Sequence, residues 1–153
     1  MDPQVRQIEK EILRWPNVTS HSHRFGGREF RWGSAEIGHV HDGGVLDVPF
    51  PRPIRDALLE EGFAEQHRWV PDSGWTTFRV RKEGSLKHAL WLLRISYLRY
   101  ALKKSDAPEA LFEQEAEHLG LSERFRSLLS PFVRPRAVLA IEFKPEMETQ
   151  RSA

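Results

Sequence analysis

The chain has 153 residues, of which 39% are hydrophobic and 29% are charged, so it is long enough to bury the core of one ordinary domain. It contains no cysteine, which excludes disulfides, thiolate metal sites and a cysteine nucleophile, and its net charge of +1 argues against a general nucleic-acid binder. No apolar segment is long enough to span a bilayer and the first residues lack a signal-peptide pattern, so we expect a cytoplasmic protein without membrane contact.

The first predicted element is a short amphipathic helix. Asp2 is a suitable N-cap, and Pro3 suits the first helical position because a missing N–H costs nothing there. Pro16 ends the pattern. The apolar stripe between them comprises Val5, Ile8, Ile12 and Trp15.

Between residues 18 and 50 the hydrophobic period changes to two, which is typical of strands. Three turn sequences divide this segment, and glycine in each favours a tight hairpin. We therefore predict a four-stranded antiparallel meander. The turns are Gly26-Gly27, Gly33-Ser34 and Asp42-Gly43-Gly44.

The register of the meander follows if the first two turns are two-residue loops. Arg24 then lies opposite Glu29, and Arg31 lies opposite Glu36, so that opposite charges pair on one face. The other face is mostly apolar, and we expect it to face the core or a pocket. Its residues are His21, His23, Phe25, Arg28, Phe30, Trp32, Ile37, His39 and His41.

The length of the third turn decides which face of the sheet carries Asp47, and two lengths are possible. A two-residue loop puts Leu46 and Val48 on the histidine-bearing face and Asp47 on the outside. A three-residue loop exchanges them and makes Asp47 a partner of the histidines. The apolar pattern favours the first arrangement, in which Asp47 is structural or exposed.

The rest of the chain is expected to alternate helices with two further strands. The long helix over 85–104 has two apolar stripes, which predicts burial on two sides, against the sheet and against a later helix or a second copy of the chain. A homodimer through this helix is therefore one expectation. The predicted elements are a helix over 53–61, strands near 63–70 and 75–81, the helix over 85–104, shorter helices to about 130, and an edge strand over 138–143.

Together these elements predict a single α+β domain over residues 1–143. An antiparallel sheet of about six strands would carry helices against its histidine-bearing face. Residues 105–143 would form a C-terminal helical extension, and residues 144–153 a loose tail.

Two H-x-H pairs are the most informative feature for chemistry. Residues two apart in a strand point the same way, so His21 and His23, or His39 and His41, could present two imidazoles to one ion or substrate. The first and third strands lie about 10 Å apart, too far for one metal to take all four. A site would centre on one pair, with His39 and His41 as metal ligands in one alternative, or the histidines would simply pack in the core.

Several common site types find little support in the sequence. The histidine spacing after Gly33 is similar to the start of a cupin metal motif, but the expected glutamate and the second half of that motif are missing. There is no nucleophile elbow of the serine hydrolases, no P-loop and no dinucleotide fingerprint.

Three segments resemble the luciferase-like domain found in fungal luciferases and in small bacterial proteins. They lie within residues 18–100, and the later residues fall outside the resemblance. The segments are Glu36–Asp42, which reads E-I-G-H-V-H-D; Gly62–His67, which reads G-F-A-E-Q-H; and Trp75-Thr76 with the helix that follows.

The resemblance implies an oxygen-dependent enzyme that acts on an enolic or phenolic, pyrone-like small molecule without an added cofactor. Three histidines would be the polar groups of its pocket, one of them acting as a general base, with Asp42 orienting one of them. A divalent metal, a non-catalytic ligand-binding module and a dimerising interaction protein are the alternatives. The implied catalytic residues are His39, His41, His67 and Asp42, and the candidate substrate-binding residues are Trp75, Phe78, Arg28 and Trp32.

Overall fold

The computed structural model describes residues 2–24, 26–81 and 83–133. The chain divides into two compact units, Met1–Leu98 and Arg99–Ala153, each of which is described by itself. Phe25, the expected edge strand over 138–143 and the expected tail lie outside the described residues. Within the described residues, no helix combines the length and apolar character needed to cross a membrane.

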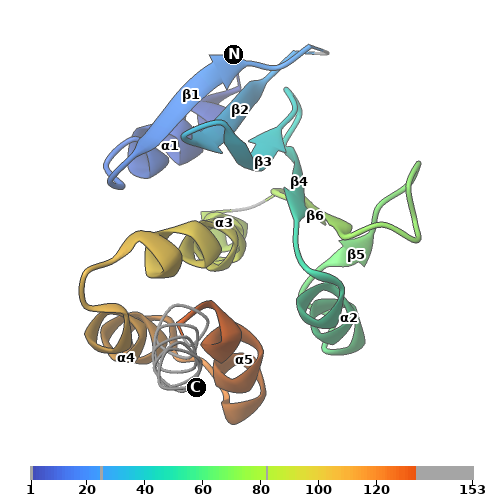
Figure 1. Cartoon of the computed structure of the whole chain (residues 1–153). Helices are drawn as coiled ribbons and strands as arrows, with labels where there is room; N and C mark the ends of the chain where they lie inside the picture. The colour runs from blue at the N-terminus through green and yellow to red at the C-terminus, as the bar shows by residue number, and fades with distance from the viewer. Residues whose placement is uncertain (1, 25, 82, 134–153) are drawn as a thin grey trace, which may run out of the picture. The chain divides into compact units, whose positions relative to one another are not determined.

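The first unit contains a six-stranded antiparallel sheet, in the order β1-β2-β3-β4-β6-β5 (Figure 1). With the helices, this sheet confirms the predicted α+β class. The predicted strand over 63–70 is reduced to two residues, because the chain turns away from the sheet at residue 67. The strands are β1 (Val18–Ser22), β2 (Arg28–Trp32), β3 (Ala35–Val40), β4 (Val45–Pro49), β5 (Glu65–Gln66) and β6 (Trp75–Arg79).

The helices of this unit begin and end close to the predicted residues. They are α1 (Pro3–Ile12), α2 (Arg52–Glu60) and α3 (Glu83–Lys104). The last begins two residues before the expected Ser85, and its residues after Leu98 belong to the second unit. Asp2 caps α1 by accepting the N–H of Gln4 at 2.7 Å, as its sequence predicts. The buried positions of α1 are Val5, Ile8 and Ile12.

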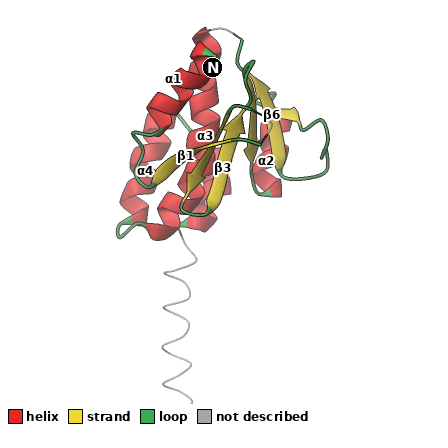
Figure 2. Ribbon diagram, turned by 90° about the horizontal axis from the view of Figure 1, so that it is seen from above, coloured by secondary structure: helices red, strands yellow, loops and turns green. Residues whose placement is uncertain are grey.

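The two faces of the sheet carry different side chains. Val40 pairs with Leu46, and both are fully buried. A Cβ at Gly38 would lie 2.6 Å from Cδ2 of Leu93, so α3 packs directly on this face. His39 points to the opposite face, because side chains alternate along a strand. The prediction that the helices cover the histidine-bearing face is therefore wrong. Figure 2 shows α1 and α3 together on one side of the sheet.

The first hairpin differs from its predicted register. Glu29 pairs with His21, and the N–H of His23 donates to the carbonyl of Gly27 at 3.3 Å, so the loop has three residues instead of two. The predicted pairing of Arg24 with Glu29 is wrong. The shift exchanges the two faces of β1, because the side-chain period of a strand is two.

A bulge in β3 sets the position of the next residues. As predicted, Arg31 of β2 pairs with Glu36 of β3. The register then shifts by one residue, so that Ile37 is an extra residue in β3 and is fully buried in the core. Glu36 and His39, three positions apart, consequently point to the same face.

The second unit is helical over its described residues. It contains α4 (Pro108–Leu119), α5 (Glu123–Leu129) and a 3-10 turn, η1 (Ser130–Phe132). Gly120 ends α4 with φ +62°, a conformation that glycine adopts without strain. Ser122 caps α5 by accepting the N–H of Phe125. Short helices from residue 108 to about residue 130 agree with the sequence pattern.

Candidate functional site

A single carboxylate, Asp47, lies at the centre of the histidine-bearing face. Its side chain is only 4% exposed. One carboxylate oxygen, Oδ2, lies 3.1 Å from Nε2 of His39, 3.1 Å from Nε2 of His41 and 3.5 Å from Nε2 of His67. The other oxygen accepts the hydroxyl of Thr77 at 2.8 Å. Four side chains from three segments of the chain therefore meet on one acid.

The position of Asp47 depends on the length of the turn before it. The N–H of His41 donates to the carbonyl of Val45 at 2.8 Å, which makes residues 42–44 a three-residue loop. This is the alternative that the apolar pattern disfavoured, so the expected position of Asp47 on the outside of the sheet is wrong. Asp42, the acid expected to orient a histidine, is exposed in the loop.

The ionisation of Asp47 follows from its hydrogen bonds. Burial alone would raise the pKa of this carboxyl above its ordinary value. Hydrogen bonds from His39, Thr77 and His41 outweigh burial and lower the pKa to about 2. Asp47 is therefore a carboxylate at every physiological pH.

His39 lies between two acids. Its Nδ1 is 2.7 Å from Oε2 of Glu36, which the bulge brings to this face, and its Nε2 faces Asp47. Burial would lower the pKa of His39, but these two partners raise it to about 9. Both ring nitrogens then carry protons, and the side chain is an imidazolium at neutral pH.

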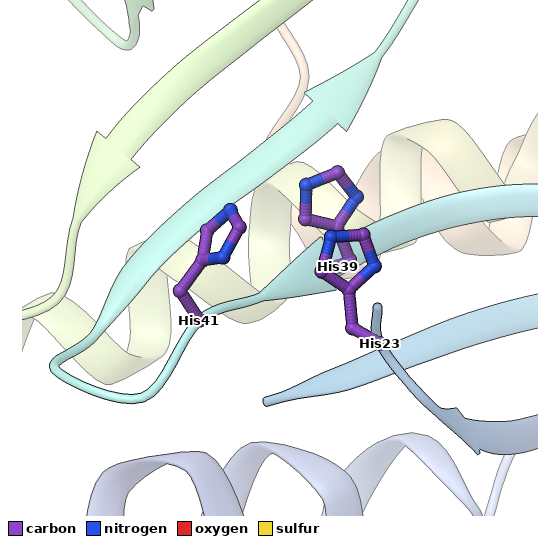
Figure 3. A group of neighbouring side chains, drawn as sticks. All are labelled: His23, His39 and His41. Atoms are coloured by element: carbon purple, nitrogen blue, oxygen red, sulfur yellow. The ribbon is translucent and has the colours of Figure 1, made fainter. Parts of the chain in front are cut away.

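His23 joins this group from the first hairpin loop. Its ring stacks on His39 with 4.0 Å between centroids, and it meets His41 edge-on at 5.1 Å (Figure 3). Burial and the charge of His39 lower the pKa of His23. The expectation that histidines of the first and third strands lie too far apart is wrong for this residue, because His23 follows the end of β1 and reaches across the loop.

Gly27 permits this approach. It has φ +84°, and a Cβ there would lie 2.0 Å from the carbonyl oxygen of Val40. Only glycine lets the backbone lie this close to β3. His21, the first histidine of the same H-x-H pair, stays with Thr19 on β1, with 2.8 Å between its Nε2 and the hydroxyl.

A pocket of about 530 Å³ opens beside Asp47. Three of the four side chains that meet there are in its wall, while His39 lies behind them. His67 reaches the pocket from the loop after β5, where its Nδ1 accepts the N–H of Trp69 at 3.2 Å. The lining residues are His41, Val45, Asp47, His67, Arg68, Trp69, Thr77 and Arg79.

The predicted substrate-binding residues divide between the two faces. Trp75 is near the site, with its ring 5.2 Å from His39. Phe78 packs on His88 of α3, and Arg28 pairs with Glu9 of α1. Trp32 lies at the end of β2, away from the pocket. The bulge in β3, which places Glu29 and not Arg28 opposite His39, and the three-residue loop after β3 account for this division.

A metal site was one expectation for His39 and His41. One ligand atom each from His23, His39 and His41 lies within 4.8 Å of the others. However, a metal needs a nitrogen lone pair, and both nitrogens of His39 face carboxylates as donors. A cation would therefore have to displace a proton and turn the ring, so this arrangement fits an imidazolium better than a metal ligand.

Asp47 and Thr77 were missed as site residues. The sequence signal for Asp47 was present, since the three-residue loop was one of two readings of Asp42–Gly44. Nothing in the sequence distinguished Thr77 from the other residues of the predicted strand.

The comparisons with known proteins agree with the motif resemblance. Residues 34–96 match the family model of the Luciferase domain, which confirms the predicted resemblance over this part of the chain. The match includes His39, His41, Asp47, His67 and Thr77, whereas His23 and Glu29 precede it. No curated protein and no solved structure matches the chain.

Proposed function

We propose that this protein is an oxygenase that removes a proton from an enolic or phenolic small molecule with a histidine base and lets the anion react with molecular oxygen. The observation that carries the proposal is the pair formed by His41 and Asp47 in the wall of the pocket. A carboxylate that orients an imidazole and supports its protonation is the usual partner of a histidine base.

His41 is the best candidate for the base. With Nε2–H donating to Asp47, the neutral ring presents Nδ1 as the proton acceptor. Both nitrogens of His39 are engaged by acids, and those of His67 by Asp47 and by the N–H of Trp69. His41 thus has the ring nitrogen best suited to take a proton from a molecule in the pocket.

The chemistry balances with oxygen as the oxidant. Transfer of the enolic proton to His41 leaves an electron-rich anion. That anion gives one electron to O₂, and the two radicals combine to form a C–O bond. The resulting peroxide anion takes the proton back from His41, so that substrate and O₂ together yield a hydroperoxide. The nearby imidazolium of His39 favours each anionic stage.

The experiment measures oxygen uptake with a panel of enolic and phenolic compounds. We expect His41→Gln to lower the rate by about 10²- to 10⁴-fold, as loss of a general base does. The control is His21→Gln, because His21 is a histidine of the same sheet that lies outside the pocket. Uptake that survives in His41→Gln would refute the assignment of the base, and an absence of uptake across the panel would refute the oxygenase.

The alternative is a non-catalytic module that binds a small molecule in the same pocket, with or without a divalent metal at His39 and His41. It predicts binding without oxygen uptake. A homodimer through residues 85–104 is a separate proposal, and it concerns the exposed positions of that helix, since Leu98 is buried within the chain.

A further inference from the structure

We infer that the pocket takes a planar organic anion, with a carboxylate read by Arg68 and Arg79 and a ring laid on Trp69. This inference rests on the proposed function only for the choice of pocket. It narrows the ligand from an enolic or phenolic molecule to one that also carries a negative group.

The first argument is the charge of the pocket wall. Arg79 is on β6, two residues beyond Thr77 and therefore on the same face, and Arg68 is in the loop after β5. Neither guanidinium has a carboxylate partner among the described residues. The acid in the wall, Asp47, already has hydrogen-bond partners in His39, His41 and Thr77. Two positive charges therefore remain for a ligand.

The chemistry of arginine favours a carboxylate. Its planar guanidinium presents donors in pairs that fit the two oxygens of a carboxylate, which a neutral hydroxyl or carbonyl cannot match. Because Arg68 and Arg79 line the same pocket as His41, an anion held by them lies within one small molecule's reach of the proposed base.

The second argument is the exposure of Trp69. The residue is 75% exposed, although it lies in the wall of a pocket and tryptophan is rarely left in water without a role. The guanidinium of Arg68 lies 5.6 Å from the centre of the indole ring. A flat surface beside a cation is suited to an aromatic or conjugated acid.

The loop that carries Trp69 is held in place without a ligand. Arg55 and Gln66 donate to the carbonyl of Pro71, and Arg52 donates to the carbonyl of Asp72 at 2.5 Å. These bonds tie the loop to α2 and β5. The binding surface is therefore formed in advance, which reduces the entropy lost on binding.

The test is calorimetric binding of matched acids and amides to the full chain. The probes are 4-hydroxybenzoate and 6-hydroxy-2-naphthoate, each compared with its neutral amide. We expect each acid to bind about 10- to 100-fold more tightly than its amide, which is the range for hydrogen bonds to a charged group. Arg68→Gln and Arg79→Gln should each remove most of that difference.

Two further variants separate charge from stacking. Arg81→Gln is the matched control, because Arg81 is an exposed arginine just beyond β6 and does not line the pocket. Trp69→Ala should weaken the acid and the amide alike. Amides that bind as well as acids, or a difference that persists in both arginine variants, would overturn the inference, and so would an absence of binding by both acids.

The outcome is separate from that of the oxygenase test. Acids that bind through the two arginines, together with an absence of oxygen uptake across the panel, would support this inference and refute the oxygenase. Oxygen uptake with neutral compounds alone would support the oxygenase and overturn the inference.

Discussion

Replacing Asp47 with asparagine tests the charge at the centre of the site. The amide keeps the shape of the side chain and an oxygen for the Thr77 hydroxyl, but it removes the negative charge that faces the histidines. The lowering of the Asp47 pKa from 3.8 to about 2 corresponds to about 2 kcal/mol of folding free energy at neutral pH. We expect Asp47→Asn to lower the free energy of unfolding by about that amount.

The directions of the two pKa shifts determine the pH range in which this loss of stability is expected. The folded-state pKa of Asp47 is lowered, so its contribution is present above pH 3.8 and is lost as pH falls through about 2. The folded-state pKa of His39 is raised, so its contribution is complete below pH 6.5 and is lost as pH rises through about 9. Both pKa shifts include the interaction between His39 and Asp47, so the two free energies are not added. The loss in Asp47→Asn should be largest between these limits and smaller above pH 9.

Urea unfolding at pH 5.5 and at pH 10, followed by tryptophan fluorescence, measures this difference. Asp42→Asn is the matched control, because Asp42 is an exposed acid in the neighbouring turn and should change stability by less than about 0.5 kcal/mol. A loss in Asp47→Asn that is the same at both pH values would refute the reasoning, since lost packing does not depend on the charge of His39.

Two further predictions concern the loop glycine and metal binding. Gly27→Ala should destabilise the fold by more than about 2 kcal/mol, because its Cβ would meet the Val40 carbonyl, whereas Gly43→Ala, at φ +100° with no atom within 4 Å, should cost only about 1 kcal/mol in the same urea assay. Zinc added to chelator-treated protein should leave Tm unchanged, because both nitrogens of His39 are occupied by carboxylates, and a rise of several degrees that His39→Ala abolishes would contradict this.

Much of the fold could be predicted from local patterns. The cap and proline of α1, the turn glycines and the long apolar stripes of α3 are signals within a few residues of each other, and they specify the elements and the meander. The pairing of Arg31 with Glu36 also followed from adjacent residues.

The site was harder to predict than the fold, because the face of the sheet to which a side chain points depends on the length of the preceding loop. One residue more or less in a hairpin exchanges the two sides of a strand. Strand β4 is also buried on both faces, so Leu46, Asp47 and Val48 are all inaccessible, and the rule that the polar side faces water fails there. Asp47 was placed on the wrong face for these reasons, whereas His23 was expected on the correct face but too far from His39.

The bulge in β3 has a consequence for how the protein tolerates changes in length. Before Ile37 the alternation of side chains places Glu36 on the histidine-bearing face. After Ile37 the alternation is shifted by one residue and places His39 and His41 on that face. Removing a single residue there would return the strand to one phase and would send either Glu36 or both His39 and His41 into the packed interior. A one-residue deletion at this point would thus exchange the solvent side of the strand for its core side, a larger change than most substitutions could cause.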